Sequence, residues 1–191
     1  MKDATRFRIA RPEDGADIAA IYAPIVEHTF ISFEEIPPTA DEMSERIATT
    51  LQTHPWLVAE DSVGVAAYAY ATAHRQRGAY KWSCDASVYV AERARRQGLA
   101  RLLYAALFET LINQGFASVF AGIALPNPAS IALHEEMGFE PIGTYPRVGF
   151  KNGSWRDVGW WGRSLQTLDG DPRPPLRFGE NLHSFVGAAL G

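Results

Sequence analysis

Residues 88–100 read Val-Tyr-Val-Ala-Glu-Arg-Ala-Arg-Arg-Gln-Gly-Leu-Ala, and this stretch indicates the fold more clearly than any other part of the chain. Three β-prone residues lead through a basic turn to a stripe of leucines, which is the pattern of a strand, a turn and a helix. Gly98 and Ala100 have almost no side chain, so backbone amides at the helix start could approach a ligand. Four arginines crowd into this part of a net acidic protein: Arg93, Arg95, Arg96 and Arg101. The stretch therefore predicts a cradle for a diphosphate.

The motif alone leaves two interpretations open. It lacks the Gly-Lys-Ser or Gly-Lys-Thr of a Walker loop, and it lacks the spacing of a GxGxxG turn. A solvated, basic helix start with one closely packed glycine would contain the same residue types. Choosing between a phosphate site and this structural alternative requires the rest of the chain.

Strand and helix patterns alternate on both sides of this stretch. Apolar residues at spacings of three and four predict helices, and short β-prone runs predict strands. The predicted strands are 7–10, 56–60, 63–70, 80–90, 118–123, 139–145 and 155–164; the predicted helices are 12–26, 41–51 (capped by Asp41), 97–115 (ended by Gly115) and 129–137. This order predicts a mixed α/β (α+β) layer architecture. We expect one domain over residues 1–168 and a tail over 169–191, in which 182–190 could add a short helix.

The composition is that of an ordinary globular chain. The 191 residues are 47% hydrophobic and 21% charged, and the formal net charge of -4 does not attract nucleic acid or an anionic membrane. The single cysteine, Cys84, cannot form an internal disulfide and fits a reducing compartment. We find neither a signal peptide nor the roughly 20 apolar residues of a membrane span. The sequence predicts a cytoplasmic protein with no nucleic acid or membrane partner.

Two segments resemble the GNAT superfamily of acetyltransferases. Arg-x-x-Gly-x-Ala at 95–100 resembles motif A, and 127–139 resembles Asn-x-x-(small)-x-x-Leu-Tyr-x-x-x-Gly-Phe, with His134 in place of tyrosine. The resemblance implies a GNAT fold with a twisted, mixed, mostly antiparallel sheet of about seven strands flanked by about four helices. It implies acetyl-CoA as cosubstrate, with its diphosphate on the turn and its pantetheine arm along the strand. The cofactor-binding residues implied are Val88, Tyr89, Val90, Arg95, Arg96, Gln97, Gly98, Leu99, Ala100, Arg101 and Asn127, the last of which could also cap its helix.

Shorter blocks within 55–60, 79–90, 125–135 and 149–159 narrow the resemblance. They are similar to phosphinothricin (bialaphos-resistance) acetyltransferases and their methionine sulfoximine relatives. This implies a homodimer that transfers acetyl directly, in a ternary complex, to the amino group of phosphinothricin, methionine sulfoximine or methionine sulfone. Two alternatives stay open. One is acetylation of another amine, such as a protein N-terminus, a polyamine or an aminoglycoside; the other is a non-catalytic acetyl-CoA sensor.

Acetyl transfer requires deprotonation of the amine, stabilisation of the thioester oxygen and departure of the coenzyme thiolate. Asp85 aligns with the family's glutamate and is the candidate base, although it is shorter and would need a raised pKa; an exposed strand carboxylate is the alternative. The resemblance implies the Tyr89–Val90 amides as oxyanion donors. His134 is the candidate for proton transfer at the thiolate or the amine, and a helix histidine bonded to its neighbours is the alternative.

The candidate acceptor-binding residues are Arg75 and Arg77, in the loop before Tyr80, together with Phe33 and Trp155. The arginines could hold a carboxylate or phosphinate by charge-assisted hydrogen bonds, and they would repel a cationic acceptor. A solvated loop is the alternative for the arginines, and ordinary core packing is the alternative for the aromatic residues. No His, Cys and Asp cluster has metal-ligand spacing, so we expect no metal.

Overall fold

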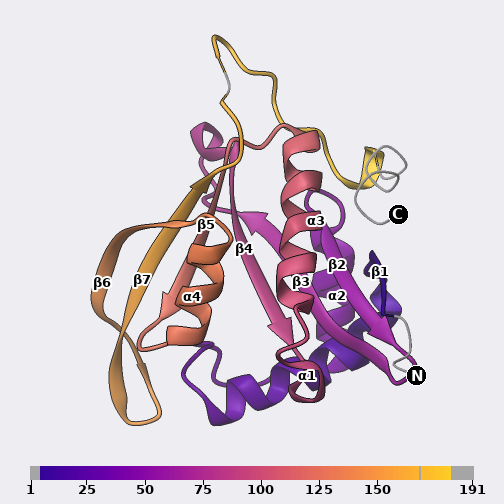
Figure 1. Ribbon diagram of the computed structural model, residues 1–191, viewed down its shortest axis with the longest axis vertical. Helices are drawn as coiled ribbons and strands as arrows, with labels where there is room; N and C mark the ends of the chain where they lie inside the picture. Colours follow the sequence, from indigo (N-terminus) through magenta and orange to yellow (C-terminus); the bar gives the residue numbers. More distant parts are fainter. Residues whose placement is uncertain (1–4, 168, 182–191) are drawn as a thin grey trace.

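Seven strands form one sheet in the order β1-β2-β3-β4-β5-β7-β6 in the computed structural model, which describes residues 5–167 and 169–181 (Figure 1). The strands are β1 (Arg6–Ile9), β2 (Trp56–Asp61), β3 (Gly64–Ala73), β4 (Ser83–Val90), β5 (Ser118–Ala124), β6 (Glu140–Lys151) and β7 (Ser154–Ser164). Neighbouring strands are antiparallel except for β4 and β5. The expected mixed, mostly antiparallel sheet is confirmed.

Helices cover both faces of this sheet. They are α1 (Gly15–His28), α2 (Ala40–Thr50), α3 (Leu99–Gln114) and α4 (Pro128–Glu136). Successive strand residues point to opposite faces, so Leu57 packs in the core beneath α3, whereas Val58 packs in the core beneath α1 and α2. In Figure 1, α3 and α4 lie in front of the sheet and α2 lies behind it. No helix of the described residues is long and apolar enough to cross a bilayer.

All four helix starts differ from the sequence predictions by one to three residues, and two of these differences have a clear local cause. Residues 12–14 form a 3-10 turn before α1 begins. The predicted cap of α2, Asp41, is wrong, because Thr39 occupies the cap position with extended backbone angles. The Thr39 hydroxyl accepts from the Glu42 amide at 3.2 Å, and the Glu42 carboxylate accepts from the Thr39 amide at 2.7 Å. This reciprocal capping box satisfies two amides that Asp41, already inside the helix, cannot reach.

The strand boundaries also shift. β4 begins at Ser83, later than predicted, because Gly78–Tyr80 form a 3-10 turn. β6 extends to Lys151 because a tight turn with positive φ at Asn152 and Gly153 joins it to β7. After β7 the chain returns to the domain: the Leu176 amide donates to the Gln114 carbonyl at 2.8 Å, and Phe178 is buried. The helix predicted over 182–190 lies outside the described residues.

The feature that creates the site is the short contact between β4 and β5. These parallel strands pair only from Ser83 to Asp85 on β4 and from Ser118 to Phe120 on β5. Beyond Asp85, β4 continues to pair with β3 up to Val90. The second half of β4 therefore has a strand neighbour on one side only, and its other side faces an opening between β4 and β5.

Candidate active site

A cavity of about 70 Å³ occupies the opening between β4 and β5. Its lining includes Ser87 and Val88 from β4, Gly122 from β5, and Asn127, Ser130 and His134 from the start and body of α4. Strand backbone, a helix start and a buried imidazole thus surround one space. Such a space suits a linear ligand that takes the place of the missing strand partner.

The backbone of β4 presents alternate amides to this opening. The Ala91 amide donates to the carbonyl of Ala66 in β3 at 2.8 Å. The pairing of β3 with β4 is regular from Val90 back to Cys84. Because backbone groups alternate along a strand, the Tyr89 amide also faces β3, whereas the Val88 and Val90 amides face the opening. The amides of Tyr89 and Val90 are expected to stabilise the oxyanion, and of these only the Val90 amide faces the opening between β4 and β5.

The helix start after β4 has open amides. Gly98 is the residue before α3 and has a φ of 82°, a left-handed conformation that favours glycine, and Arg96 has a φ of 62°. No side chain of the described residues caps this helix start, and the first amide bonded into the helix is that of Leu102, which donates to the Gly98 carbonyl. The amides of Leu99, Ala100 and Arg101 therefore lie in the positive end of α3 without a helical acceptor, which fits a phosphate.

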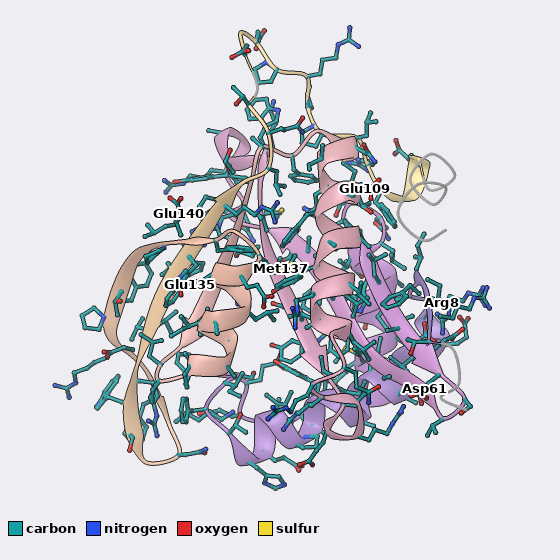
Figure 2. The ribbon with its side chains drawn as sticks, viewed as in Figure 1. Arg8, Asp61, Glu109, Glu135, Met137 and Glu140 are labelled. Atoms are coloured by element: carbon teal, nitrogen blue, oxygen red, sulfur yellow. The ribbon has the colours of Figure 1, made fainter. Side chains whose placement is uncertain are left out.

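The four arginines of this segment have different partners. Arg93 binds Asp61, which lies at the end of β2 in Figure 2, and also donates to the Val65 carbonyl. Arg101 binds Glu136 of α4 at 2.7 Å. Within the described part of the chain, neither Arg95 nor Arg96 has an ion pair. The cationic side chains that are available to an anion at this turn are therefore Arg95 and Arg96.

His134 is held as one tautomer. Its side chain is buried, with Nδ1 2.7 Å from the Ser130 carbonyl oxygen and Nε2 3.0 Å from the Tyr104 hydroxyl. A carbonyl only accepts, so Nδ1 carries the proton and Nε2 accepts from Tyr104. Burial lowers the pKa of His134, and the bond to Ser130 opposes that shift. The imidazole is therefore neutral at neutral pH, and Tyr104, which the sequence did not single out, is its partner.

Asn127 caps α4 and also lines the opening between β4 and β5. Its side-chain oxygen accepts from the Ser130 amide at 3.2 Å, so it is the cap of α4. The same residue lines the opening between β4 and β5. The capping role predicted for Asn127 is confirmed, and it leaves the side-chain amide nitrogen at the cavity.

Asp85 lies on the opposite face of the sheet from His134. The side chains of Cys84 and Ala86 belong to the core beneath α3, so Asp85 between them points toward the face of α1 and α2. Its Oδ1 is 2.6 Å from Nδ1 of His74, and its side chain is 28% exposed. Burial raises the pKa of Asp85, whereas the hydrogen bond from His74 lowers it. Asp85 is therefore a half-buried, bonded carboxylate rather than a freely exposed one.

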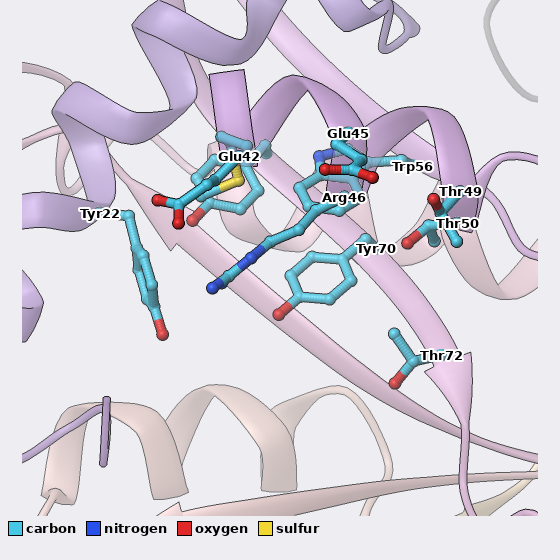
Figure 3. Close-up of a pocket in the computed structure, with 11 residues that line it drawn as sticks. Tyr22, Glu42, Glu45, Arg46, Thr49, Thr50, Trp56, Tyr70 and Thr72 are labelled. Atoms are coloured by element: carbon cyan, nitrogen blue, oxygen red, sulfur yellow. The ribbon is translucent and has the colours of Figure 1, made fainter. Parts of the chain in front are cut away.

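A larger cavity of about 510 Å³ lies on the same face, between α2 and the β2–β3 hairpin (Figure 3). Its aromatic wall includes Trp56 and Tyr70, whose rings stack with centroids 4.2 Å apart. The indole nitrogen of Trp56 is buried without a hydrogen-bond partner among the described residues. Thr72 also lines this cavity and lies opposite Asp85 in the β3–β4 register, so the cavity reaches the neighbourhood of that carboxylate.

An ion pair borders the same cavity. The Arg46 guanidinium points between the rings of Tyr22 and Tyr70 in Figure 3. It donates to both carboxylate oxygens of Glu34, at 2.8 and 2.9 Å, and the Tyr22 hydroxyl donates to Glu34 at 2.9 Å. Tyr22 also lines a third cavity, of about 460 Å³, together with Phe33 and residues at the β4–β5 opening. The third cavity thus shares Tyr22 with the larger cavity and Tyr89 and Gly122 with the β4–β5 opening. The sequence did not predict Trp56, Tyr70, Arg46 or Tyr22 as lining residues.

The predicted acceptor-binding residues are not gathered in one pocket. Arg75 lies over the Trp160 ring at 5.6 Å, and exposed Arg77 precedes the turn at Gly78–Tyr80. Phe33 is in contact with the backbone of β6. Trp155 is 53% exposed on the β6–β7 hairpin, away from the larger cavity. Phe33 lines the third cavity, whereas Arg75, Arg77 and Trp155 line none of the three cavities described above.

A metal centre is not assembled by the described residues, since they include no group of three His, Cys, Asp or Glu that could hold an ion. The one thiol, Cys84, is buried and its pKa is raised by burial, so it is a packed residue.

Comparison with known proteins agrees with this geometry. The family model described as an acetyltransferase (GNAT) domain matches residues 7–160. The chain is 40% identical over 168 residues (86% of this chain, 91% of the relative) to phosphinothricin N-acetyltransferase of Streptomyces viridochromogenes. It is 37% identical over 154 residues (80% and 90%) to an L-methionine sulfoximine/L-methionine sulfone acetyltransferase of Pseudomonas paraeruginosa. A phosphinothricin acetyltransferase from Sinorhizobium meliloti, solved in complex with acetyl-CoA, superposes with a TM-score of 0.83 at 33% identity and covers 93% of this chain and 99% of its own. The chain therefore belongs to the GNAT family of acetyltransferases.

Proposed function

We propose that this enzyme transfers the acetyl group of acetyl-CoA to the amino group of a small, amino-acid-like acceptor of the phosphinothricin, methionine sulfoximine or methionine sulfone type. The observation that carries the proposal is the half-paired strand β4, which ends at the open amide start of α3. The names of the similar relatives support the acceptor class. Transfer is direct, because the only thiol of the chain is buried and offers no nucleophile for a covalent intermediate.

Two sets of backbone groups bind the coenzyme in this proposal. The amides of Gly98 to Arg101 hold the diphosphate, and the Arg95 and Arg96 side chains add charge. The Val88 backbone groups and the Val90 carbonyl take the pantetheine arm as a strand partner would. Asn127 at the start of α4 bonds a pantetheine amide. Tyr89 and Gln97 have the lesser role of shaping the strand and the turn.

The proton-transfer groups are assigned by their faces. Asp85 lies on the α1–α2 face, where the acceptor cavities open, so the amine loses its proton on that side. His134 lies on α4, next to Tyr104 of α3, on the other face, so it serves the departing thiolate. The Val90 amide stabilises the thioester oxygen as it gains charge.

The acceptor carboxylate is held by Arg75 and Arg77, and Phe33 covers the entrance between the cavities. Cationic side chains at this position select an anionic or zwitterionic amino acid over a polyamine or aminoglycoside. Trp155 reaches an acceptor only from the hairpin of a second subunit, since it lies outside the cavities described for one chain.

A homodimer is proposed on the exposed apolar surface of the β6–β7 hairpin. The side chains that form it are Ile142, Tyr145, Val148, Phe150 and Trp155, each at least half exposed. A surface of this kind marks an interface. Sedimentation of the purified chain tests this, and Phe150→Glu is expected to give a monomer. A cytoplasmic location is also proposed, because a single buried thiol fits a reducing compartment.

The function is tested by release of coenzyme A thiol from acetyl-CoA over a panel of acceptors. Phosphinothricin, methionine sulfoximine and methionine sulfone are expected to react, whereas spermidine, an aminoglycoside and a peptide N-terminus are not. Reaction only with spermidine, the aminoglycoside or the peptide N-terminus would show that the enzyme acts on another class of acceptor. Tight acetyl-CoA binding in calorimetry, without thiol release for any amine, would identify a sensor instead.

A further inference from the structure

We propose that His74 is the base of the reaction and that Asp85 acts behind it as the residue that orients it. The pair then works as an Asp–His dyad, in which Nε2 of His74 takes the proton of the acceptor amine. This inference rests on the proposed acetyl transfer, because it names the group that deprotonates the acceptor.

The first observation is the hydrogen bond between the two side chains. Nδ1 of His74 lies 2.6 Å from Oδ1 of Asp85, and both side chains are largely covered, at 15% and 28% exposure. A carboxylate accepts, so Nδ1 donates and Nε2 carries the lone pair. This arrangement fixes the tautomer and directs the basic nitrogen away from the carboxylate, as in other dyads in which a carboxylate orients a histidine.

The second observation is the position of the ring. His74 follows directly after β3 and reaches across β4 to stack on Phe120 of β5, with ring centroids 4.6 Å apart. The edges of Tyr80 and Trp160 lie on two further sides, each 5.9 Å away by ring centroid. Stacking and the bond to Asp85 together hold the imidazole on the α1–α2 face of the sheet. This is the face on which the acceptor cavities open.

The third observation is that Nε2 of His74 makes no hydrogen bond to any described residue. The charged or titratable side chains near the ring are those of Asp85, Arg75 and Tyr80. Arg75 donates to the backbone carbonyl of His74, so its guanidinium stays beside the ring and can hold an acceptor carboxylate there. The acceptor ammonium, one carbon away from that carboxylate, then lies next to the free nitrogen.

The chemistry favours the imidazole over the carboxylate as the proton acceptor. Asp85 already uses Oδ1 to accept from His74, and its short side chain leaves it close to the strand. The imidazole has a second nitrogen that accepts no hydrogen bond from a described residue, and it is the side chain type that changes charge nearest neutral pH. Nε2 takes one proton from the acceptor ammonium, and the freed amine forms the C–N bond with the acetyl carbon. The C–S bond breaks, the coenzyme thiolate leaves with the electron pair, and it takes up the second proton that the nitrogen loses as the amide forms.

The test compares His74→Gln, His74→Ala, Asp85→Asn and the control His28→Gln, whose side chain is 74% exposed on α1. We expect His74→Gln to lower kcat by roughly 10²- to 10⁴-fold and to remove the acidic limb of the kcat/KM pH profile, while acetyl-CoA still raises the melting temperature. Added imidazole should restore part of the kcat of His74→Ala but not of Asp85→Asn. His28→Gln should behave as the wild type.

Two outcomes would overturn the dyad. One is a His74→Gln variant within threefold of the wild-type kcat with the acidic limb unchanged, which would leave Asp85 as a base on its own. The other is a His74→Ala variant that folds, binds acetyl-CoA and loses activity without any rescue by imidazole, which would make His74 a support for the acceptor pocket. Both leave the acetyltransferase assignment intact, because the wild-type assay tests that separately.

Discussion

The hydroxyl of Tyr104 on α3 donates to Nε2 of His134 on α4 across 3.0 Å. With the Ser130 carbonyl on the other ring nitrogen, both nitrogens of the imidazole are bonded and the ring is held in one orientation. Burial raises the pKa of Tyr104 well above its usual value, so this hydroxyl stays protonated and remains a donor. A proton that reaches or leaves His134 on the side of the opening must therefore involve this bond.

Tyr104→Phe is accordingly expected to lower kcat about tenfold or more, because Nε2 of His134 loses the hydroxyl that donates to it and through which a proton would pass. The affinity for acetyl-CoA should change little, since the backbone sites at β4 and α3 are untouched. Steady-state kinetics and calorimetry measure the two effects. An unchanged kcat would show that the Tyr104–His134 bond has a structural role only.

The left-handed backbone at Gly98 gives the second prediction. A Cβ at Gly98 would meet no atom within 4 Å, so Gly98→Ala acts through its φ of 82° alone. We expect a loss of about 1 kcal/mol in the free energy of unfolding and about tenfold weaker acetyl-CoA binding, because the strained residue turns the amides of α3 out of place. Gly153→Ala is the matched control, with a φ of 72° and equally open surroundings in the β6–β7 turn. It should lose similar stability and keep its coenzyme affinity; equal weakening in both variants would remove the turn from the coenzyme site.

Sequence alone predicted the turn before α3 and the cap of α4, and it missed the residues that line the cavity on the α1–α2 face. The turn at Gly98 and the cap at Asn127 are local features, since each depends on residues within one strand, turn and helix. The pair His74–Asp85 depends on the register of β3 against β4, and no short-range pattern encodes it. The unpartnered indole of Trp56 likewise becomes visible only when α2 lies over β2. Residues brought together by sheet pairing therefore needed the structure.

Stability should fall as the solution is acidified below neutral pH. Burial lowers the pKa of His54 to about 4, and burial also lowers the pKa of His134. The pKa of a histidine in the unfolded chain is near 6.5. At pH values between this and the lower pKa values of the folded chain, the unfolded chain binds protons that the folded chain does not. Acidification from pH 7 to pH 4 therefore favours unfolding, and His54 contributes roughly 2–3 kcal/mol of that loss.

Urea unfolding of His54→Gln at several pH values checks this directly. The variant should lose less free energy of unfolding than the wild type between pH 7 and pH 4, although it starts from a lower value. His28→Gln, in which an exposed imidazole is removed, should keep the wild-type slope. Parallel curves for the wild type and His54→Gln would contradict the assignment.

Lys151 connects the end of β6 to the loop that carries Phe33. The buried ammonium donates to the carbonyls of Val26, Ser32 and Glu34 at 2.7, 2.7 and 2.6 Å. Lys151→Met keeps the length of the side chain and leaves three carbonyls without their donor, so we expect about 3 kcal/mol of destabilisation in urea unfolding.

The same substitution should separate the two substrates. The loop held by Lys151 borders the cavity proposed for the acceptor but not the turn at the start of α3, so KM for the acceptor should rise several-fold while the acetyl-CoA affinity stays constant. Lys81→Met is the matched control, because Lys81 is exposed and lies over the Trp82 ring at 4.4 Å. It should cost less than about 1 kcal/mol. If Lys151→Met weakens the binding of acetyl-CoA as much as the binding of the acceptor, the loop has no selective role, because a general loss of packing would affect both sites alike.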